Sequence, residues 1–206
     1  MRKKLFITGI GTDVGKTVVS AIVCEALKAD YWKPIQAGDA ETGDRKTIQN
    51  LITNVNTTIH PNTWTLTSAM SPHAAAEIDR VKILTKDIHE PQTKNHLVIE
   101  GAGGVLVPIN STETIMDIIK EDHHVLVVSQ HYLGSINHTL MTVKLLQQQG
   151  LEVSLIFNGD ENSATEKIIQ SMTGVKVIGR INQEKKVNAE MICKYAGLLE
   201  PQLRRL

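Results

Sequence analysis

The sequence has few of the residues that mark several classes of protein. Among its 206 residues are only two cysteines, Cys24 and Cys193, and aromatic residues make up 3% of the chain. Both cysteines fall in stretches predicted to be helical and far apart, so we expect reduced, buried thiols and no disulfide framework. Basic and acidic residues number 22 each, which gives a net charge of zero. That balance favours neither a general nucleic-acid surface nor an anionic-membrane surface.

Long apolar runs are also missing. Only three apolar residues follow the basic start before Thr8, too few for a signal peptide, and no later run is long enough to span a bilayer. The eight histidines include no pair at the i, i+4 spacing of a zinc-binding helix. We therefore expect a cytoplasmic protein without a membrane or nucleic-acid partner, folded as one domain over residues 1–206.

The most informative stretch is the glycine-rich segment Gly9–Thr17, which ends in Gly-Lys-Thr. A short apolar run precedes it and a helix-length stretch follows it, which is the context of a phosphate-binding loop. Five residues separate Gly9 from Gly15, one more than in the usual pattern. Such a loop points backbone N–H groups at an anion, with Lys16 reaching the β- and γ-phosphates and Thr17 holding Mg²⁺.

The rest of the chain alternates between strand and helix patterns. The predicted strands are Lys4–Thr8, Tyr31–Pro34, His96–Glu100, His124–Ser129, Glu152–Asn158 and Lys176–Gly179. The predicted helices are Lys16–Ala29, Arg45–Thr53, Thr114–Glu121, Ser135–Gln149, Ser163–Met172 and Glu184–Tyr195. Several strands have continuous apolar cores, which is typical of a parallel sheet covered on both faces. We predict a doubly wound α/β fold with its ligands at the carboxyl ends of the strands.

Charged side chains follow two of these strands. Glu100 leads into the glycines of Gly101–Gly104, where a carboxylate could hold Mg²⁺ and glycines would let backbone amides approach a phosphate. Lys33 is followed by Pro34, whose fixed φ makes the lysine a positioned cation. Asp44 lies at the start of a predicted helix, where both a metal ligand and an N-cap remain open.

Five motifs then occur in order along the chain. They are Gly9–Thr17, Lys33-Pro34 with Gly38, Thr67–His73, Glu100–Gly104 and Leu133–His138. Together they resemble the dethiobiotin synthetase family, over most of the chain. The loop alone is shared with partition ATPases, whereas the combination of the other motifs is more specific.

The resemblance implies a P-loop NTPase fold and an ATP- and Mg²⁺-dependent ligase of biotin biosynthesis. Its substrate would be 7,8-diaminopelargonic acid (7,8-diaminononanoate), which takes up CO₂ to form a carbamate. ATP would convert the carbamate into a carbamic-phosphoric anhydride, and ring closure would give dethiobiotin, ADP and phosphate. The resemblance also implies a homodimer with its sites at the interface.

The resemblance assigns roles to named positions. The catalytic residues would be Lys33, Lys16 and Thr12, and the metal ligands Thr17, Asp44 and Glu100. The ATP-binding residues would be Asp13, Val14, Gly15, Lys16, Thr17, Val18, Asp44, Glu100, Gly101, Ala102, Gly103, Asn158 and Asn182. The substrate-binding residues would be Thr12, Lys33, Ala37, Gly103, Leu133, Ser135 and Asn137, the last three from the other subunit, although Ser135 also fits an ordinary helix cap.

Two positions depart from the family pattern, and two other functions remain open. Ala37 replaces a Ser or Thr that contacts the substrate in the family. Asn182 stands where a Pro is usual near the base, which predicts a relaxed choice of nucleotide. A partition-type ATPase switch would need a second lysine early in the loop, where this chain has Ile10 and Gly11. A metabolite kinase would turn over without CO₂. The sequence leaves the roles of His73 and His131 undecided.

Overall fold

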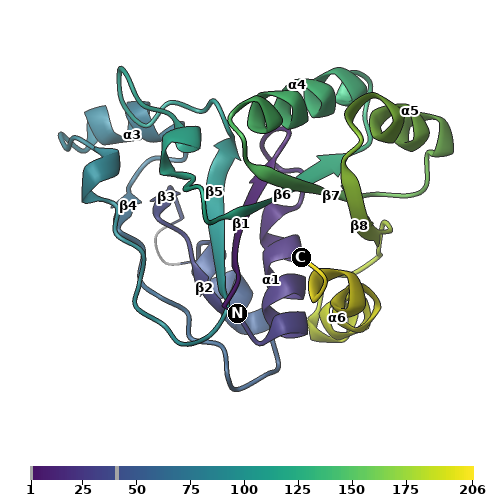
Figure 1. Cartoon of the computed structure of the whole chain (residues 1–206). Coiled ribbons are helices and arrows are strands. Elements are labelled where there is room, and N and C mark those ends of the chain that lie inside the picture. Colours follow the sequence, from purple (N-terminus) through teal and green to yellow (C-terminus); the bar gives the residue numbers. More distant parts are fainter. Residues whose placement is uncertain (1, 40–41) are drawn as a thin grey trace.

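A six-stranded parallel sheet forms the centre of the computed structural model, which describes residues 2–39 and 42–206 (Figure 1). The strand order is β2-β5-β1-β6-β7-β8, and every neighbouring pair is parallel. The strands are β1 Lys4–Gly9, β2 Asp30–Trp32, β5 Leu97–Gly104, β6 His124–Gln130, β7 Glu152–Asn158 and β8 Lys176–Ile181. The predicted parallel sheet is confirmed.

The continuous apolar runs lie inside this sheet. Leu97–Ile99, Val125–Val128 and Leu155–Phe157 are all buried. Side chains on a strand alternate between the two faces of the sheet, so burial of every residue in a run requires a cover on both faces. The runs therefore predicted correctly that helices flank the sheet on either side.

Helices connect the strands in two opposite directions. The helices of the main fold are α1 Lys16–Leu27, α2 Asp44–Leu51, α4 Ser135–Gln148, α5 Ser163–Thr173 and α6 Ala189–Leu203. α1 leads from β1 toward β2, whereas α4 and α5 lead from β6 toward β8. Right-handed crossovers in opposite directions place their helices on opposite faces, and α1 packs beside α6 while α4 packs beside α5 (Figure 1). Within the described ranges, no helix combines the length and the apolar character needed to cross a membrane.

Several short elements were not predicted from the sequence. β3 Ile35–Ala37 and β4 Trp64–Leu66 pair as a separate two-stranded parallel sheet. The helix α3 Pro72–Ile78 and the 3₁₀ helix η1 Thr85–Asp87 follow. Strands of three residues are too short to show a hydrophobic period, so the sequence pattern does not reveal them.

Two predicted helices have the wrong extent. Thr114–Glu121 is only the 3₁₀ helix η2 Ile115–Ile118, which ends because the backbone of Ile119 is extended (φ −75°, ψ 129°). The predicted helix from Glu184 begins instead at Ala189. Asn188 is its N-cap, with a side chain that accepts from the amide of Met191 at 2.9 Å. This helix also continues through Pro201 to Leu203.

The glycine-rich segment after Glu100 is part of a strand and not a turn. β5 continues to Gly104, which pairs with Gly9 beyond an irregularity in the β1–β5 register. The two glycine-containing segments run side by side here, and a Cβ on Gly104 would be in ordinary van der Waals contact with the carbonyl oxygen of Gly9, at 3.4 Å. The prediction that Glu100 ends its strand was therefore wrong.

The two cysteines have different environments. Cys24 is fully buried, as predicted, whereas Cys193 is exposed. The buried face of α6 includes Met191, Ile192 and Tyr195, and position 193 falls outside that stripe. The prediction of a buried Cys193 was therefore wrong, because its helix presents one apolar face only.

A charge cluster near the amino end of β1 centres on Glu90. Its carboxylate lies 2.7 Å from Lys4 Nζ, 2.7 Å from Lys120 Nζ and 3.0 Å from His123 Nε2. Burial alone would raise the pKa of Glu90, but hydrogen bonds from Lys120, Lys4 and His123 outweigh it and lower the pKa to about 2. The ionised carboxylate therefore stabilises the fold.

We expect Glu90→Gln to lower the free energy of unfolding by about 1–3 kcal/mol near neutral pH, because three donors lose an anionic partner. The pKa of Glu90 is depressed on folding, so its contribution is present above the unfolded value of 4.5 and is lost as the pH falls toward 2. Urea unfolding at about pH 7 and about pH 3 measures this difference.

The control is Glu152→Gln, because Glu152 is an exposed carboxylate 3.3 Å from His124. It should change stability by less than about 0.5 kcal/mol. An equal loss for Glu90→Gln at both pH values would contradict the proposed charge effect.

Candidate active site

The glycine-rich loop connects β1 to α1 as predicted. Asp13 and Gly15 both have left-handed backbones, with φ of 56° and 94°. Lys16 is the first residue of α1, and its Nζ donates to the carbonyl of Gly11 at 3.0 Å. The loop thus precedes a helix N-terminus, whose unpaired amides favour an anion.

The side chain of Asn158, at the end of β7, fixes the loop from outside. Its Nδ2 donates to the carbonyl of Val14 at 2.9 Å. A Cβ on Gly15 would lie 2.3 Å from the same nitrogen. Gly15 is therefore required for two reasons, its left-handed backbone and the close approach of Asn158.

Three oxygen-bearing side chains meet beside the loop. The Oγ1 of Thr17 lies 2.9 Å from Asp44 Oδ1 and 3.0 Å from Glu100 Oε1. Thr17 comes from α1, Asp44 from the first turn of α2 and Glu100 from β5. Gly43 is the N-cap of α2 and makes no side-chain cap bond. Of the two roles left open for Asp44, the N-cap is therefore excluded.

Lys33 lies between the two carboxylates. Its ammonium forms an ion pair with Asp44 and lies 3.6 Å from Glu100 Oε1. Burial alone would lower the pKa of Lys33, but the charges of Glu100 and Asp44 outweigh it and raise the pKa. Burial lowers the pKa of Lys16 on balance. The prediction that Lys33 is a positioned cation is confirmed.

Tyr31 completes this cluster and was not predicted as a site residue. The Tyr31 hydroxyl donates to Glu100 Oε2 at 3.0 Å, and both side chains are buried. Burial and the charges of Glu100 and Asp44 raise the pKa of Tyr31, which keeps the hydroxyl protonated and able to donate. A tyrosine in a short buried strand looks like a core residue in the sequence, so no pattern reveals this role.

The chemistry of these donors fits Mg²⁺. Thr17, Asp44 and Glu100 offer hard oxygen atoms, two of them on anionic groups, and the Thr17 hydroxyl lies 2.9 and 3.0 Å from the two carboxylates. Mg²⁺ is usually held by one or two carboxylates together with water and phosphate. The described residues contain no group of three or more His, Cys, Asp or Glu side chains arranged to hold a metal.

A cavity of about 790 Å³ joins the loop to this cluster. The predicted site residues that line it are Thr12, Asp13, Gly15, Lys16, Thr17, Val18, Lys33, Ala37, Asp44, Glu100, Ala102 and Gly103. Residues that were not predicted to bind also line it: Gln36, Asp39, Ala69, Met70, Ser71, Pro72 and Val107. Val14 is buried, and a Cβ on Gly101 would meet Phe6 and Ile115, so these two predicted residues do not line the cavity.

Leu133, Ser135 and Asn137 lie elsewhere, in a separate hollow of about 730 Å³ at the start of α4. The N-cap of α4 is Gly134, with φ of 99°, and no side chain caps the helix. Ser135 is buried as the first helical residue, so it is not the ordinary helix cap considered from the sequence. The side chain of Leu133 is wholly exposed. Within one chain, these residues do not join the phosphate-loop cavity.

Of the remaining residues considered from the sequence, Asn158, Asn182 and His131 lie at the ends of neighbouring strands, and His73 lies in α3. Asn158 pairs with Ile181, so the exposed Asn182 follows directly at the end of β8. The ring of His131 stacks on Phe157 and lies 2.9 Å from Glu166 Oε1. The His73 ring lies 3.1 Å from the Ser71 hydroxyl.

Comparison with known proteins identifies the family. A family model described as an AAA domain matches residues 3–191. The chain is 52% identical over 204 residues to the ATP-dependent dethiobiotin synthetase BioD of Christiangramia forsetii, covering 98% of this chain and 99% of that protein. It is 49% identical to the protein of the same name from Cytophaga hutchinsonii, covering 94% and 95%. The chain belongs to the dethiobiotin synthetase family.

Solved structures resemble this dethiobiotin synthetase family member at the level of the fold. A putative plasmid partition protein from Borrelia burgdorferi bound to AMPPNP has a TM-score of 0.62 at 14% identity, covering 100% of this chain and 99% of that one. A ParA family ATPase from Chlorobium tepidum has a TM-score of 0.59 at 14% identity, covering 95% and 98%. At such low identity the likeness shows a shared fold and no shared activity.

We expect Tyr31→Phe to lower the free energy of unfolding by about 1–3 kcal/mol, because it leaves a buried oxygen of Glu100 without its donor. Urea unfolding of both proteins at neutral pH measures the loss. The control is Tyr132→Phe, because that hydroxyl is on an exposed side chain and lies 2.8 Å from His138. Equal stability of Tyr31→Phe and the unaltered protein would show that the Tyr31–Glu100 bond contributes nothing.

Proposed function

We propose that this protein closes the ring of dethiobiotin from 7,8-diaminopelargonic acid (7,8-diaminononanoate) and CO₂, with conversion of ATP to ADP and phosphate. The observation that carries the proposal is 52% identity, over 98% of the chain, to a protein named ATP-dependent dethiobiotin synthetase. The clustering of Lys16, Lys33 and two carboxylates beside a phosphate-binding loop supports it. The reaction would take place in the cytoplasm.

The proposed chemistry has three steps. One neutral amine adds to CO₂ and loses a proton, which gives a carbamate. A carbamate oxygen then attacks the γ-phosphorus of ATP, and the bond to ADP breaks to leave a carbamic-phosphoric anhydride. The second amine attacks the anhydride carbon, the carbon–oxygen bond to phosphate breaks, and the cyclic urea forms.

The cations of the site would reduce the electrostatic repulsion between the two anions that react in the second step. An anionic carbamate and an anionic γ-phosphate repel each other, so positive charge must lie between them. Lys16 at the loop and Lys33 across the cavity would supply it, and Thr12, which also lines the cavity, would donate to the carbamate or γ-phosphate. Mg²⁺, held by Thr17, Asp44 and Glu100, would add charge at the phosphates.

In the structure, the carboxylates of Asp44 and Glu100 pair with Lys33. Its ammonium contacts Asp44 and lies 3.6 Å from Glu100 Oε1, the oxygen nearest Thr17. A cation held by these oxygens would compete with Lys33 for them. We infer that Lys33 then turns toward the substrate, which would couple metal binding to the placement of the catalytic cation.

Nucleotide binding is proposed along the carboxyl ends of the central strands. The backbone of Asp13–Val18 would bind the phosphates, with Gly101–Gly103 beside it. Asn158 and Asn182 would contact the base. An asparagine amide offers both a donor and an acceptor for this purpose.

The substrate would bind across a homodimer interface. Ala37 and Gly103 line the phosphate-loop cavity, where the diamine end would lie. Leu133, Ser135 and Asn137 line a different hollow, beside the N-terminus of α4. A second subunit that brings this helix N-terminus to the cavity would supply unpaired amides for the substrate carboxylate. The wholly exposed Leu133 is consistent with such a contact.

The alternative function is a partition-type ATPase switch. The likeness to partition proteins is at the fold level, with 14% identity. Ile10 and Gly11 occupy the early loop positions where a second lysine would be expected for that class. Binding to DNA or lipid that depends on nucleotide would favour this alternative.

Release of ADP tests the reaction class. With ATP and Mg²⁺ present, we expect release only when both 7,8-diaminopelargonic acid and bicarbonate are added. Dependence on the diamine alone would indicate a metabolite kinase. Release that needs neither compound would overturn the proposal in favour of a nucleotide switch.

We expect Lys33→Ala to reduce turnover by a factor on the order of 10²–10³, because it removes one preorganised charge from a phosphoryl-transfer site. ATP binding, measured by calorimetry, should be largely retained, since Lys16 and the loop remain. Lys144→Ala, on the exposed side of α4, is the control and should keep normal turnover. A Lys33→Ala protein that binds ATP poorly but turns over normally once loaded would contradict the role of Lys33.

A further inference from the structure

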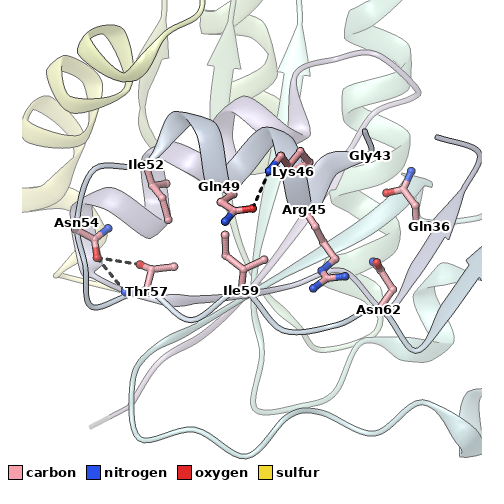
Figure 2. Close-up of a pocket in the computed structure, with 10 residues that line it drawn as sticks. All are labelled: Gln36, Gly43, Arg45, Lys46, Gln49, Ile52, Asn54, Thr57, Ile59 and Asn62. Atoms are coloured by element: carbon pink, nitrogen blue, oxygen red, sulfur yellow. Dashed lines mark hydrogen bonds between the residues drawn. The ribbon is translucent and has the colours of Figure 1, made fainter. Parts of the chain in front are cut away.

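A second hollow lies between α2 and the segment that follows it, residues 52–62 (Figure 2). Its volume is about 540 Å³. The residues that line it are Gln36, Gly43, Arg45, Lys46, Gln49, Ile52, Asn54, Thr57, Ile59 and Asn62. No part of the proposed reaction uses these side chains, with the exception that Gln36 also lines the phosphate-loop cavity.

The lining of this hollow is cationic. Arg45 and Lys46 supply two positive charges, and the lining residues include no aspartate or glutamate. The Nε of Arg45 is buried without a hydrogen-bond partner in the described part of the chain. In Figure 2 the Arg45 guanidinium extends from α2 into the hollow beside Asn62. A guanidinium with an unused donor is suited to a carboxylate or phosphate oxygen.

The other lining groups would bind the remainder of a small ligand. Asn62 Nδ2 already donates to the Lys33 carbonyl and the Thr57 hydroxyl to the Ala29 carbonyl, so these side chains offer their oxygen atoms and the second Asn62 proton. The Gln49 amide nitrogen adds a further donor. Ile52 and Ile59 add a short apolar wall. This combination suits a small organic anion better than a bare metal ion, because the charge of the wall is positive.

The hollow is connected to the proposed catalytic groups by two hydrogen bonds. Asn62 Nδ2 donates to the backbone carbonyl of Lys33 at 2.7 Å. The Oε1 of Gln36 accepts from the backbone amide of Asp44 at 3.4 Å. Arg45 is the next residue after Asp44 in α2. A ligand here would therefore touch the residues that hold Lys33 and Asp44 in position.

We propose that this hollow is a second binding site, which takes a small molecule through a carboxylate or phosphate group on Arg45 and Lys46. An anion bound there neutralises positive charge one residue away from Asp44. The potential at the Asp44 carboxylate becomes more negative, which favours a bound cation. Occupation of the hollow thus strengthens Mg²⁺ binding at the active site. Anion binding itself does not depend on the proposed function, whereas its effect on turnover rests on it.

Binding is tested with two probes, succinate and inorganic phosphate, on the full chain saturated with ADP and Mg²⁺ so that the phosphate loop is occupied. Backbone amide NMR shifts are followed during each titration. We expect saturable shifts at residues 43–49 and 57–62. Arg45→Gln should weaken the binding about tenfold, through loss of a charge-assisted contact. Lys46→Gln is the second variant, and Lys144→Gln is the matched control with unchanged binding.

The outcomes separate the ligand classes. Binding of succinate alone identifies a carboxylate ligand, binding of phosphate alone identifies a phosphate ligand, and binding of both supports an oxyanion site. The proposal is overturned if neither probe binds, if shifts appear only outside the hollow, or if binding is the same in Arg45→Gln and the unaltered protein.

The link to the active site has a separate test. The Mg²⁺ concentration that gives half-maximal ADP release is measured with and without the binding probe. We expect the probe to lower it about twofold in the unaltered protein, the size expected for a screened charge nearby, and to leave it unchanged in Arg45→Gln. An equal effect in both proteins would overturn the link. The NMR result stands even if the protein has no dethiobiotin synthetase activity.

Discussion

The pairing of Lys33 with two carboxylates is the interaction on which the rest of the site depends. Glu100 is almost wholly buried, and Asp44 lies within reach of the same threonine hydroxyl. Two carboxylates this close repel each other unless a cation lies between them. The fold supplies that cation from the residue after β2, one carboxylate from β5 and the other from α2. Three segments far apart in the sequence are thereby held together at one edge of the sheet by charge as well as by packing.

Hydrogen bonds from uncharged side chains orient these charged groups. Tyr31 occupies Oε2 of Glu100, which leaves Oε1 facing Thr17 and Lys33. Asn62 fixes the carbonyl of Lys33 from outside the cavity. The charged groups therefore have little freedom to rearrange before a ligand arrives. Preorganisation of this kind is what phosphoryl transfer requires, since it removes reorganisation from the reaction itself.

Sequence patterns predicted the features that depend on local order. The phosphate-binding loop, the parallel strands and the positioned Lys33 all follow from residues within a few positions of one another. The patterns failed where distant contacts decide the structure. η2 is held to the distant segment 105–107 by two backbone hydrogen bonds and ends at the extended Ile119, and Tyr31 is a partner of Glu100 only through the β2–β5 pairing. The three-residue strands β3 and β4 and the start of α6 were missed for the same reason: pairing partners and caps, not period, define them.

The close fit of Asn158 against Gly15 has a consequence for the way in which the protein would recognise its nucleotide. One proton of the Asn158 amide is committed to the carbonyl of Val14, inside the phosphate loop. The second proton and the amide oxygen remain for a base, if Asn158 reads it as proposed. The base and the phosphates of the nucleotide would then contact two segments that the Asn158–Val14 hydrogen bond joins. A base of the wrong shape would tilt Asn158 and, through Val14, disturb the amides around the triphosphate, so that selectivity for the base would show itself in the rate of phosphoryl transfer as much as in affinity.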